Sequence, residues 1–311
     1  MTISKEQLLE RRKYIGASDC ASVLGMSRWG TPLSIWAEKT EQVELKERED
    51  LHLTLGTRLE EVVAELFEKK TGKKVHRVND TVYHKQHKFI ACNLDRRVVG
   101  EDADLECKTA SGWSAKEFEG DEIPREYILQ CYHSMAVTGR KKMYLAVLIG
   151  NQDFKIKEIL ADKKVQDDII KKEVYFWNTF VIPRAMPTMI LSGDTDALNA
   201  LFPSVTNKDT LLLDDTANAL SESLEALKSD AKMLKDTIEK TQNELKALLK
   251  DCETGTTDKW IISWKDSTYS WVDTEMLETK HPDVFKEVYK TKPIRKFHSK
   301  KIKENKEKNN V

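Results

Sequence analysis

The chain has 311 residues, 40% of them hydrophobic and 33% charged, so it can bury one large core or a core with an accessory element. A formal net charge of −1 argues against a polycationic coat but allows a local basic cleft. The five cysteines form no CxxC pair, and the longest apolar run, residues 143–149, is too short to span a membrane. These features predict a soluble cytoplasmic protein with reduced thiols, and they argue against a disulfide framework or a zinc or iron–sulfur centre.

Residues 1–205 combine helical and strand periods, as in one folded domain. In chain order, the first predicted elements are helices over residues 5–13, 17–24, 32–40 and 56–70. The last of these is strongly amphipathic, with apolar side chains at helical spacing: Leu59, Val62, Val63, Leu66 and Phe67. Gly72 is a suitable stop for this helix.

Beyond this helix, the spacing of apolar residues changes from that of helices to that of strands. Short segments rich in β-branched or apolar residues predict an antiparallel meander over residues 75–78, 81–83, 89–94 and 104–109. A helix over 125–138, closed by Gly139, and a buried strand over 142–149 follow. This order of elements predicts an α/β fold with a central mixed sheet flanked by helices.

Residues 206–289 are predicted to form an accessory region that starts with a long helix over 214–253. Along it, mostly apolar residues recur in steps of three and four, as in a coiled coil: Ala217, Leu220, Leu224, Leu227, Ala231, Leu234, Ile238, Thr241, Leu245, Leu248 and Cys252. This stripe must be buried on something. Docking within the chain, as in a helical hairpin, and association with a second copy or another protein are both open.

The sequence beyond the long helix predicts a small β-hairpin with strands over 259–264 and 269–272. Its aromatic residues are expected to form the core of a small sheet, although they could instead stack on exposed bases: Trp260, Trp264, Tyr269 and Trp271. Residues 290–311 carry nine Lys or Arg against two Glu and predict a disordered tail. Such a tail either contacts phosphates or only keeps the chain soluble.

One short stretch suggests chemistry: DLECKT, residues 104–109, which follows Asp95 after a turn. In a strand, Glu106 and Lys108 leave the same face because side chains repeat every two residues. Carboxylates and carbonyls are the ligands that Mg²⁺ prefers, so Asp95, Glu106 and the backbone carbonyl of Cys107 could bind Mg²⁺ or Mn²⁺. Lys108 could then position water or neutralise charge on a phosphate. The alternative is a half-exposed strand whose charged residues only face water.

Four sequence blocks support the first interpretation. They are RRKYIGASD from Arg11, LGTRLE from Leu55, ACNLD through LECKT from Ala91, and YILQCYHSMAVTG from Tyr127. In this order, over about the first 150 residues, they resemble the lambda-exonuclease and YqaJ-like viral recombinase family. The resemblance implies a PD-(D/E)xK nuclease core, with Asp95 and Glu106 as metal-binding carboxylates and Lys108 as the catalytic lysine.

The same resemblance gives roles to further residues. It implies that Glu60 is an additional active-site acid and that Gln130 is the glutamine that follows the family's tyrosine, here Tyr127. Arg11 and Ser18 match the pair associated with the terminal 5′-phosphate, and Tyr127 is expected on the DNA side of the site. A guanidinium with a hydroxyl suits a phosphate monoester. Without the resemblance, each of these residues could have an ordinary role. These roles are a solvated glutamate for Glu60, a core glutamine for Gln130, a surface arginine for Arg11 and a helix cap for Ser18.

The function implied by the resemblance is that of a deoxyribonuclease of phage or prophage recombination in a bacterial cytoplasm. It would use Mg²⁺ or Mn²⁺ to digest the 5′ strand at linear double-stranded DNA ends and leave 3′ single strands for an annealing protein. The lambda-type enzymes are ring-shaped trimers, which suggests a homo-oligomer. Two alternatives are an endonuclease of the same fold and a non-catalytic DNA-binding or assembly factor.

Two positions depart from the superfamily's pattern. Leu94 stands where a proline often precedes the first acid, and Arg96 stands where a small residue often follows it. Unlike proline, Leu94 has a backbone N–H, so this departure only adds a hydrogen-bond donor. Arg96 could lie near the DNA backbone or form a local salt bridge.

Overall fold

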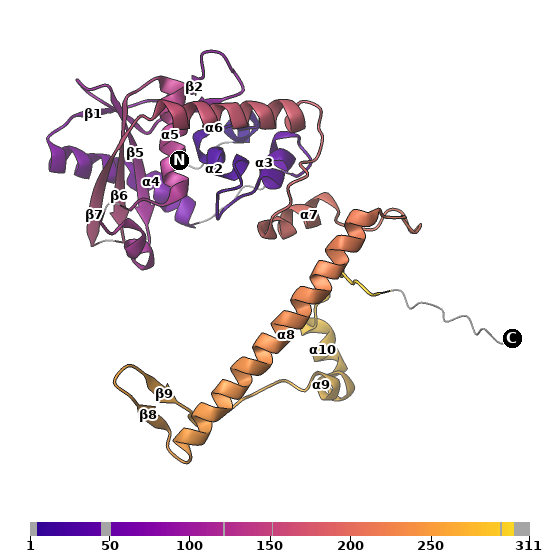
Figure 1. The fold of residues 1–311 in the computed structure, drawn as a ribbon. Coiled ribbons are helices and arrows are strands. Elements are labelled where there is room, and N and C mark those ends of the chain that lie inside the picture. Colours follow the sequence, from indigo (N-terminus) through magenta and orange to yellow (C-terminus); the bar gives the residue numbers. More distant parts are fainter. Residues whose placement is uncertain (1–4, 45–50, 121, 151, 293, 302–311) are drawn as a thin grey trace. The chain divides into compact units, whose positions relative to one another are not determined.

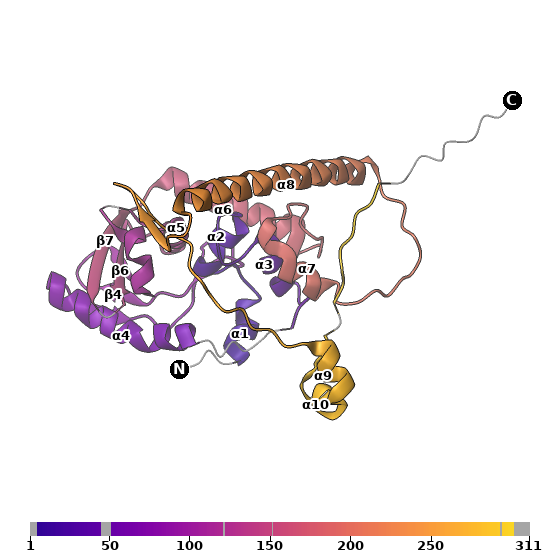
Figure 2. The same ribbon diagram turned by 90° about the horizontal axis from the view of Figure 1, so that it is seen from below.

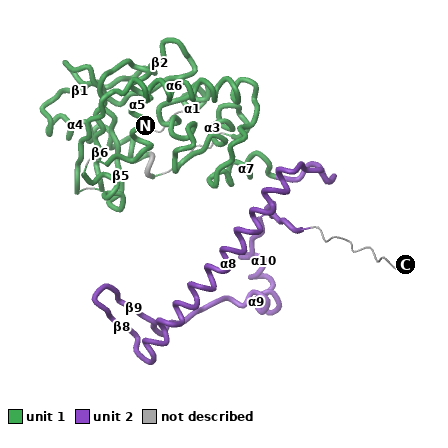
Figure 3. Tube along the Cα trace, in the orientation of Figure 1, with its two compact units in different colours: residues 1–203 green, residues 204–311 purple. Residues whose placement is uncertain are grey.

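A computed structural model describes residues 5–44, 51–120, 122–150, 152–292 and 294–301. The chain divides into two compact units, residues 1–203 and 204–311 (Figure 3). Of the predicted basic tail, residues 293 and 302–311 lie outside the described part. Among the described residues, no helix combines the length and the apolar character that crossing a bilayer requires.

The first unit contains seven α-helices among its described residues. They are α1 Lys5–Arg11, α2 Cys20–Val23, α3 Pro32–Lys39, α4 Leu51–Thr71, α5 Arg125–Thr138, α6 Lys163–Phe176 and α7 Thr195–Leu201. Short 3₁₀ or π-helical turns connect or extend them: η1 Ala17–Asp19, η2 Gly112–Phe118, η3 Trp177–Val181 and η4 Ser192–Asp194. The predicted helices therefore form, although α4 begins five residues before its predicted start at Gly56.

The strands of this unit build one main sheet and one separate pair. They are β1 Val75–Arg77, β2 Val82–Tyr83, β3 Ala91–Cys92, β4 Arg96–Val98, β5 Ala103–Ala110, β6 Lys142–Ile149 and β7 Asp153–Leu160. The main sheet has the order β1-β4-β5-β6-β7, with β5 and β6 parallel and the other neighbours antiparallel. The predicted mixed sheet is confirmed.

The predicted meander is wrong in its details. β2 and β3 pair with each other outside the main sheet, and β1 pairs with β4, which was not predicted. β4 is only three residues long and contains two arginines, so it lacks the apolar pattern of a strand. β7 was also missed, although its charged and apolar residues alternate as in a half-exposed edge strand.

Helices cover both faces of the main sheet (Figure 1). On one face, Phe67 of α4 packs in a buried cluster with Leu105 and Cys107 of β5. On the other, Met135 of α5 packs in a second cluster with Leu145 of β6. Side chains alternate along a strand, so the even-numbered residues of β5 face α5 while the odd-numbered ones face α4.

α5 matches its predicted bounds. Its first residue follows Pro124, and it ends at Gly139, whose φ of 77° is readily adopted only by glycine. The N–H of Gly139 donates to the Met135 carbonyl at 2.8 Å. Both ends of the helix that carries Gln130 are thus fixed by the sequence.

A buried ion pair joins α5 to its neighbours. His133 Nδ1 lies 2.8 Å from Glu173 Oε1 on α6, and His133 Nε2 lies 2.9 Å from the carbonyl of Ala91 on β3. A carbonyl and a carboxylate only accept, so both ring nitrogens donate and the imidazole is protonated. Burial by itself lowers the pKa of His133, but the Glu173 carboxylate raises it above its ordinary value. The thiol of Cys20 lies beside the same pair, and burial together with the Glu173 carboxylate raises the pKa of this thiol well above its ordinary value.

The described part of the second unit contains α8 Asp215–Leu249, β8 Thr254–Thr256, β9 Ile261–Ser263, α9 Thr274–Lys280 and α10 Pro282–Val288. The long helix forms from an N-cap at Asp214 that accepts from the N–H of Thr216, but it ends at Leu249, before its predicted end at residue 253. Figures 1 and 2 show α8 as one continuous helix.

The small hairpin is present and β9 lies within the predicted strand over 259–264, but the predicted partner of that strand is wrong. β8 pairs with β9, whereas residues 269–272 form no strand. The predicted aromatic core is also wrong, because Trp260, Tyr269 and Trp271 are all more than 70% exposed. With three residues in each strand, the hairpin offers too little surface to cover them.

We predict that the His133–Glu173 pair contributes strongly to stability. His133→Ala leaves the Glu173 carboxylate buried without its cation, and we expect the free energy of unfolding to fall by about 3–5 kcal/mol. Urea unfolding of the full chain measures this change. As a control, His133→Phe combined with Glu173→Leu removes both charges and should recover most of the loss. A cost below about 1 kcal/mol for His133→Ala, the size of an exposed ion pair, would contradict the prediction.

Candidate active site

The Asp95 carboxylate lies at the edge of β5, where β4 and β5 separate. The two strands pair only over Arg96–Arg97 with residues 104–105. Beyond that pairing, the main-chain N–H of Cys107 donates to Asp95 Oδ2 at 2.7 Å. The N–H and C=O of one strand residue leave the same edge of the strand, so the Cys107 carbonyl also faces the edge where Asp95 lies.

Glu106 and Lys108 lie on the α5 face of β5, beside Asp95. Glu106 Oε1 accepts from Lys108 Nζ at 2.7 Å and from Gln130 Nε2 at 2.5 Å. Glu106 is 3% exposed, so the alternative of a charged strand face turned to water is wrong. Two donors on one carboxylate, one of them charged, hold it in a single orientation. The structure thus brings three of the predicted residues into direct contact.

The electrostatics of this cluster favour a cation. Burial raises the pKa of Asp95 well above its ordinary value, and the nearby Glu106 and Glu60 carboxylates raise it further, against the opposing effect of Lys108. Burial alone would lower the pKa of Lys108, but Glu106 and Asp95 raise it above its ordinary value. Lys108 is therefore protonated at neutral pH and cannot act as a base there. Two carboxyl groups, those of Asp95 and Glu106, therefore lie beside a single lysine.

The donor set fits a hard divalent cation. Asp95 and Glu106 offer carboxylate oxygens, and the Cys107 carbonyl faces the same edge as Asp95. Oxygen ligands of this kind suit Mg²⁺ and Mn²⁺, and a divalent charge would offset the repulsion between the two neighbouring carboxylates.

Arg96 bridges the site to α4. Its Nη1 donates to Glu60 Oε1 at 2.5 Å and to the main-chain oxygen of Asp95 at 2.6 Å, while its Nη2 donates to Glu61 Oε2 at 3.0 Å. The Arg96 side chain is only 3% exposed, which excludes it as a surface contact for the DNA backbone. Arg77 Nη2 pairs with Glu61 from the exposed side, at 2.8 Å. Glu60 is thus attached to the segment that carries Asp95, and it is not a freely solvated residue.

The predicted phosphate-binding pair is also in contact. Arg11 Nη2 donates to Ser18 Oγ at 2.8 Å, joining α1 to η1. The buried Lys39 supports this arrangement, since its Nζ donates to the Arg11 carbonyl at 2.8 Å and to Asp19 Oδ2 at 2.7 Å. η1 packs against α5, the helix that carries Gln130.

Tyr127 contacts the site through its ring. Lys108 Nζ lies 5.6 Å from the ring centroid, within the range of a cation–π contact. The ring also packs against Phe118 and Trp29, with centroid distances of 6.0 and 5.6 Å. Burial raises the pKa of Tyr127, so it remains a neutral phenol. Trp29 is 62% exposed and extends this aromatic group to the surface.

Comparison with known proteins agrees with this geometry. The family model of the YqaJ-like viral recombinase domain matches residues 7–141. The uncharacterized protein YqaJ of Bacillus subtilis (strain 168) is 36% identical over 300 residues, which cover 96% of this chain and 94% of that protein. The chain belongs to the YqaJ-like viral recombinase family. The resemblance seen in the four sequence blocks is therefore confirmed.

Solved structures extend the comparison of this YqaJ-like chain to its fold. An alkaline exonuclease (LHK-Exo) from Laribacter hongkongensis superposes with a TM-score of 0.51 at 18% identity, covering 58% of this chain and 94% of that chain. The same exonuclease in complex with dAMP gives a TM-score of 0.50 at 20% identity, with the same coverage. At this identity the likeness concerns the fold, and it confirms the nuclease-type core that the sequence predicts.

Several residues of the YqaJ-like site were not predicted. Lys39 and Trp29 reach it only through the tertiary structure, and nothing in their local sequence marks them. The role of Arg96 was left open, although its place directly after Asp95 was noted. Glu61 was missed although it had a local signal, because it adjoins Glu60 on the amphipathic helix that the sequence predicts.

We predict that Arg96 positions the site without contacting the phosphate. Arg96→Lys keeps the charge but loses the planar fork that serves Glu60, Glu61 and the Asp95 carbonyl. A residue that orients metal ligands typically changes metal affinity by about 10–100-fold, and we expect Mn²⁺ binding to weaken by that amount. Isothermal titration calorimetry measures the change. Arg77→Lys alters the exposed partner of Glu61 and is the matched control. Equal affinities for Arg96→Lys and the wild type would contradict this role.

Proposed function

We propose that the chain is a metal-dependent deoxyribonuclease that digests the 5′ strand of double-stranded DNA ends and leaves 3′ single strands. The observation that carries the proposal is the convergence of Asp95, Glu106 and Lys108 at the open edge of β5. Membership of the YqaJ-like viral recombinase family supports it. A structural neighbour is named an alkaline exonuclease and was solved with dAMP, a deoxynucleoside monophosphate, which is consistent with it.

The proposed mechanism is hydrolysis of a phosphodiester. Asp95, Glu106 and the Cys107 carbonyl would hold Mg²⁺ or Mn²⁺, which, when bound, supplies charge stabilisation at the phosphate and a more acidic water. The oxygen of water adds to phosphorus, the bond to one bridging oxygen breaks, and that oxygen takes up a proton. Lys108 pairs with Glu106 at 2.7 Å, and Glu106 and Asp95 raise its pKa against the opposing effect of burial, which favours the protonated, donating form. It would orient the water or stabilise charge on the phosphate.

The other site residues act through these groups. Gln130 fixes the Glu106 carboxylate through its 2.5 Å hydrogen bond, and Arg96 fixes Glu60 beside Asp95. Precise placement of ligands and water is a large part of catalysis in phosphoryl transfer. Glu60 would add negative charge near the metal, with Arg96 limiting its repulsion from Asp95.

The proposed preference for 5′ ends depends on Arg11 and Ser18. Their contact at 2.8 Å places a guanidinium and a hydroxyl together, as a terminal phosphate monoester requires. Tyr127 and the exposed Trp29 would line the DNA side of the site. We further propose that the 3′ strand passes to a single-strand annealing protein, in a bacterial cytoplasm and in the context of phage or prophage recombination.

We predict that Lys108→Ala lowers the rate of divalent-metal-dependent digestion of linear duplex by at least about 100-fold, the effect of removing one donor to a developing charge. Binding of the duplex should persist. Release of acid-soluble nucleotide measures digestion, and an electrophoretic mobility shift measures binding. Lys172→Ala, which removes an exposed lysine paired with Asp168, is the control. Unchanged digestion by Lys108→Ala would rule out this site, and nicking of covalently closed circles would favour an endonuclease.

We predict that the enzyme releases label from a 5′ end first and prefers a 5′-phosphorylated end. The substrate is a blunt linear duplex labelled at either the 5′ or the 3′ end, with and without the 5′-phosphate. Arg11→Ala should remove the preference for the phosphate, since the fork that pairs with it is lost. Lys13→Ala, which removes a nearby exposed cation, is the control. Early release of the 3′ label would reverse the proposed polarity.

A further inference from the structure

Lys39 places a charge in the interior of the first unit, beside the Arg11–Ser18 pair. It is the last residue of α3, and its side chain is 0% exposed. A buried ammonium is costly unless it is paired and hydrogen-bonded. Lys39 Nζ meets this need with two short bonds, to the Asp19 carboxylate and to the Arg11 main-chain carbonyl. Because it is buried, Lys39 can influence DNA binding only through these partners.

Asp19 links Lys39 to the turn that carries Ser18. Its Oδ2 accepts from Lys39 Nζ at 2.7 Å and from the main-chain N–H of Gly16 at 3.0 Å. The N–H of Asp19 in turn donates to the Gly16 carbonyl at 2.9 Å. Two hydrogen bonds between Gly16 and Asp19 therefore close this turn, with Ser18 inside it.

Lys39 also holds the segment that carries the arginine. Arg11 is the last residue of α1, where main-chain carbonyls have no partner within the helix. Lys39 Nζ donates to the Arg11 carbonyl at 2.8 Å, and the guanidinium of Arg11 reaches Ser18 Oγ at 2.8 Å. One ammonium is thus bonded to both segments that supply the predicted phosphate-binding pair.

Two cations compete for the Asp19 carboxylate. Burial raises the pKa of Asp19, but Lys39 and then Arg11 lower it, and the result lies below its ordinary value. Asp19 is therefore an anion at neutral pH. Lys39 pairs with it at 2.7 Å, whereas the Arg11 guanidinium donates to the neutral hydroxyl of Ser18. Glu38 is a more distant partner of Lys39, at 3.6 Å. An arginine paired with a carboxylate would have less of its fork to offer to a phosphate.

We propose that Lys39 is a positioning residue of the terminal-phosphate site, where it neutralises Asp19 and so keeps the Arg11 fork available for the 5′-phosphate. This inference rests on the proposed function of Arg11 and Ser18. It implies that the charge of Lys39 matters for phosphate recognition although the residue is buried. A lysine that only joined α3 to η1 would change stability and leave phosphate recognition as it is.

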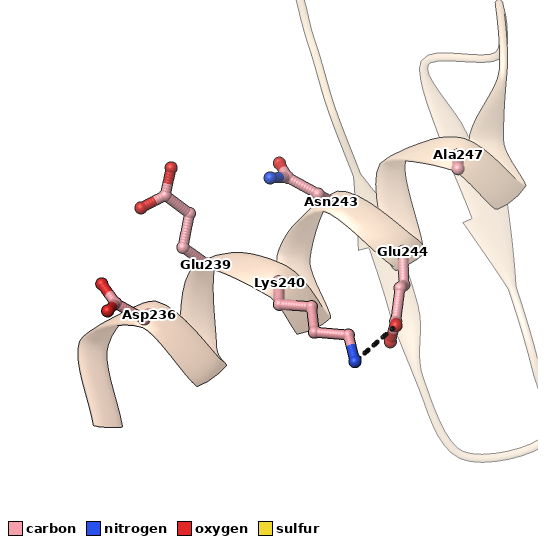
Figure 4. Close-up of a pocket in the computed structure, with 6 residues that line it drawn as sticks. All are labelled: Asp236, Glu239, Lys240, Asn243, Glu244 and Ala247. Carbon is pink, nitrogen blue, oxygen red and sulfur yellow. Dashed lines mark ion pairs between the residues drawn. The ribbon is translucent and has the colours of Figure 1, made fainter. Parts of the chain in front are cut away.

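A hollow along α8 also contains a lysine but does not suit a phosphate. The residues that line it are mostly acidic or otherwise polar: Asp236, Glu239, Lys240, Asn243, Glu244 and Ala247 (Figure 4). Its lysine is paired with Glu244 at 3.9 Å, and the acids would repel a phosphate. Lys240 is thus a lysine with an acidic partner in the other unit of the chain, and it provides a matched control.

Binding of short DNA duplexes to the full chain tests the role of Lys39 without requiring digestion. A blunt duplex with or without a 5′-phosphate is titrated in EDTA, and fluorescence anisotropy gives the two dissociation constants. Their ratio measures the preference for the phosphate. We expect the wild type to show this preference and Lys39→Met to lose it, because the unpaired Asp19 carboxylate then attracts the Arg11 guanidinium. Lys240→Met should keep it.

A second substitution separates the effect of charge from damage to the fold. Asp19→Asn removes the competing anion, while its amide oxygen can still accept from the N–H of Gly16. Lys39→Met combined with Asp19→Asn should therefore regain the preference that Lys39→Met loses. Circular dichroism reports whether each variant folds. If Lys39→Met does not fold, Lys39→Gln makes the same comparison, since it keeps a hydrogen-bond donor without the charge.

Three results would each overturn the inference. They are a wild type without the preference, an unchanged preference in folded Lys39→Met or Lys39→Gln, and a double variant that does not regain it. Failure of the proposed nuclease function is a separate result, namely no digestion of linear duplex with Mg²⁺ or Mn²⁺. In that case, loss of the binding preference in Lys39→Met and its recovery with Asp19→Asn would still support the role of Lys39.

Discussion

The hydrogen bond from the Cys107 main-chain N–H to the Asp95 carboxylate determines how the rest of the site is arranged. β4 leaves β5 after a pairing of two residues, and this bond at 2.7 Å then takes the place of the next rung of the ladder. A side chain thereby satisfies a buried N–H that would otherwise be costly. The same bond holds Asp95 beside Glu106, whose side chain leaves β5 one residue earlier. Two carboxylates and a carbonyl can then meet one cation.

Bringing the carboxylates together is unfavourable, and two cations with different tasks offset it. Lys108 lies within the cluster, contacts Glu106 and is held protonated by its neighbours. Arg96 lies behind the cluster and pairs with Glu60 and Glu61 on α4 while donating to the Asp95 carbonyl. A lysine is a compact donor suited to a reacting phosphate, whereas the arginine fork suits a fixed network. The divalent cation would complete this balance of charge.

The sequence predicts the elements with a strong period and the residues that lie on them. α5 and β6 have their predicted bounds, and the shared face of Glu106 and Lys108 follows from strand alternation, whereas Gln130 was identified through the family resemblance. What depends on tertiary contacts could not be predicted. β4 has too few residues and too much charge to show a strand pattern, so the place of Arg96 in the sheet was hidden. The partnership of His133 with Glu173 joins residues forty apart and has no local signal.

The central claim is that Asp95 and Glu106 form one divalent-metal site at the edge of β5. Anomalous diffraction from crystals soaked in MnCl₂ tests it most directly. The account predicts a peak within about 2–2.6 Å of oxygens of Asp95, Glu106 and the Cys107 carbonyl, as expected for a hard cation. It also predicts that the peak is lost in Asp95→Asn. A manganese peak elsewhere, such as among Cys20, His133 and Glu173, with none between Asp95 and Glu106, would contradict it.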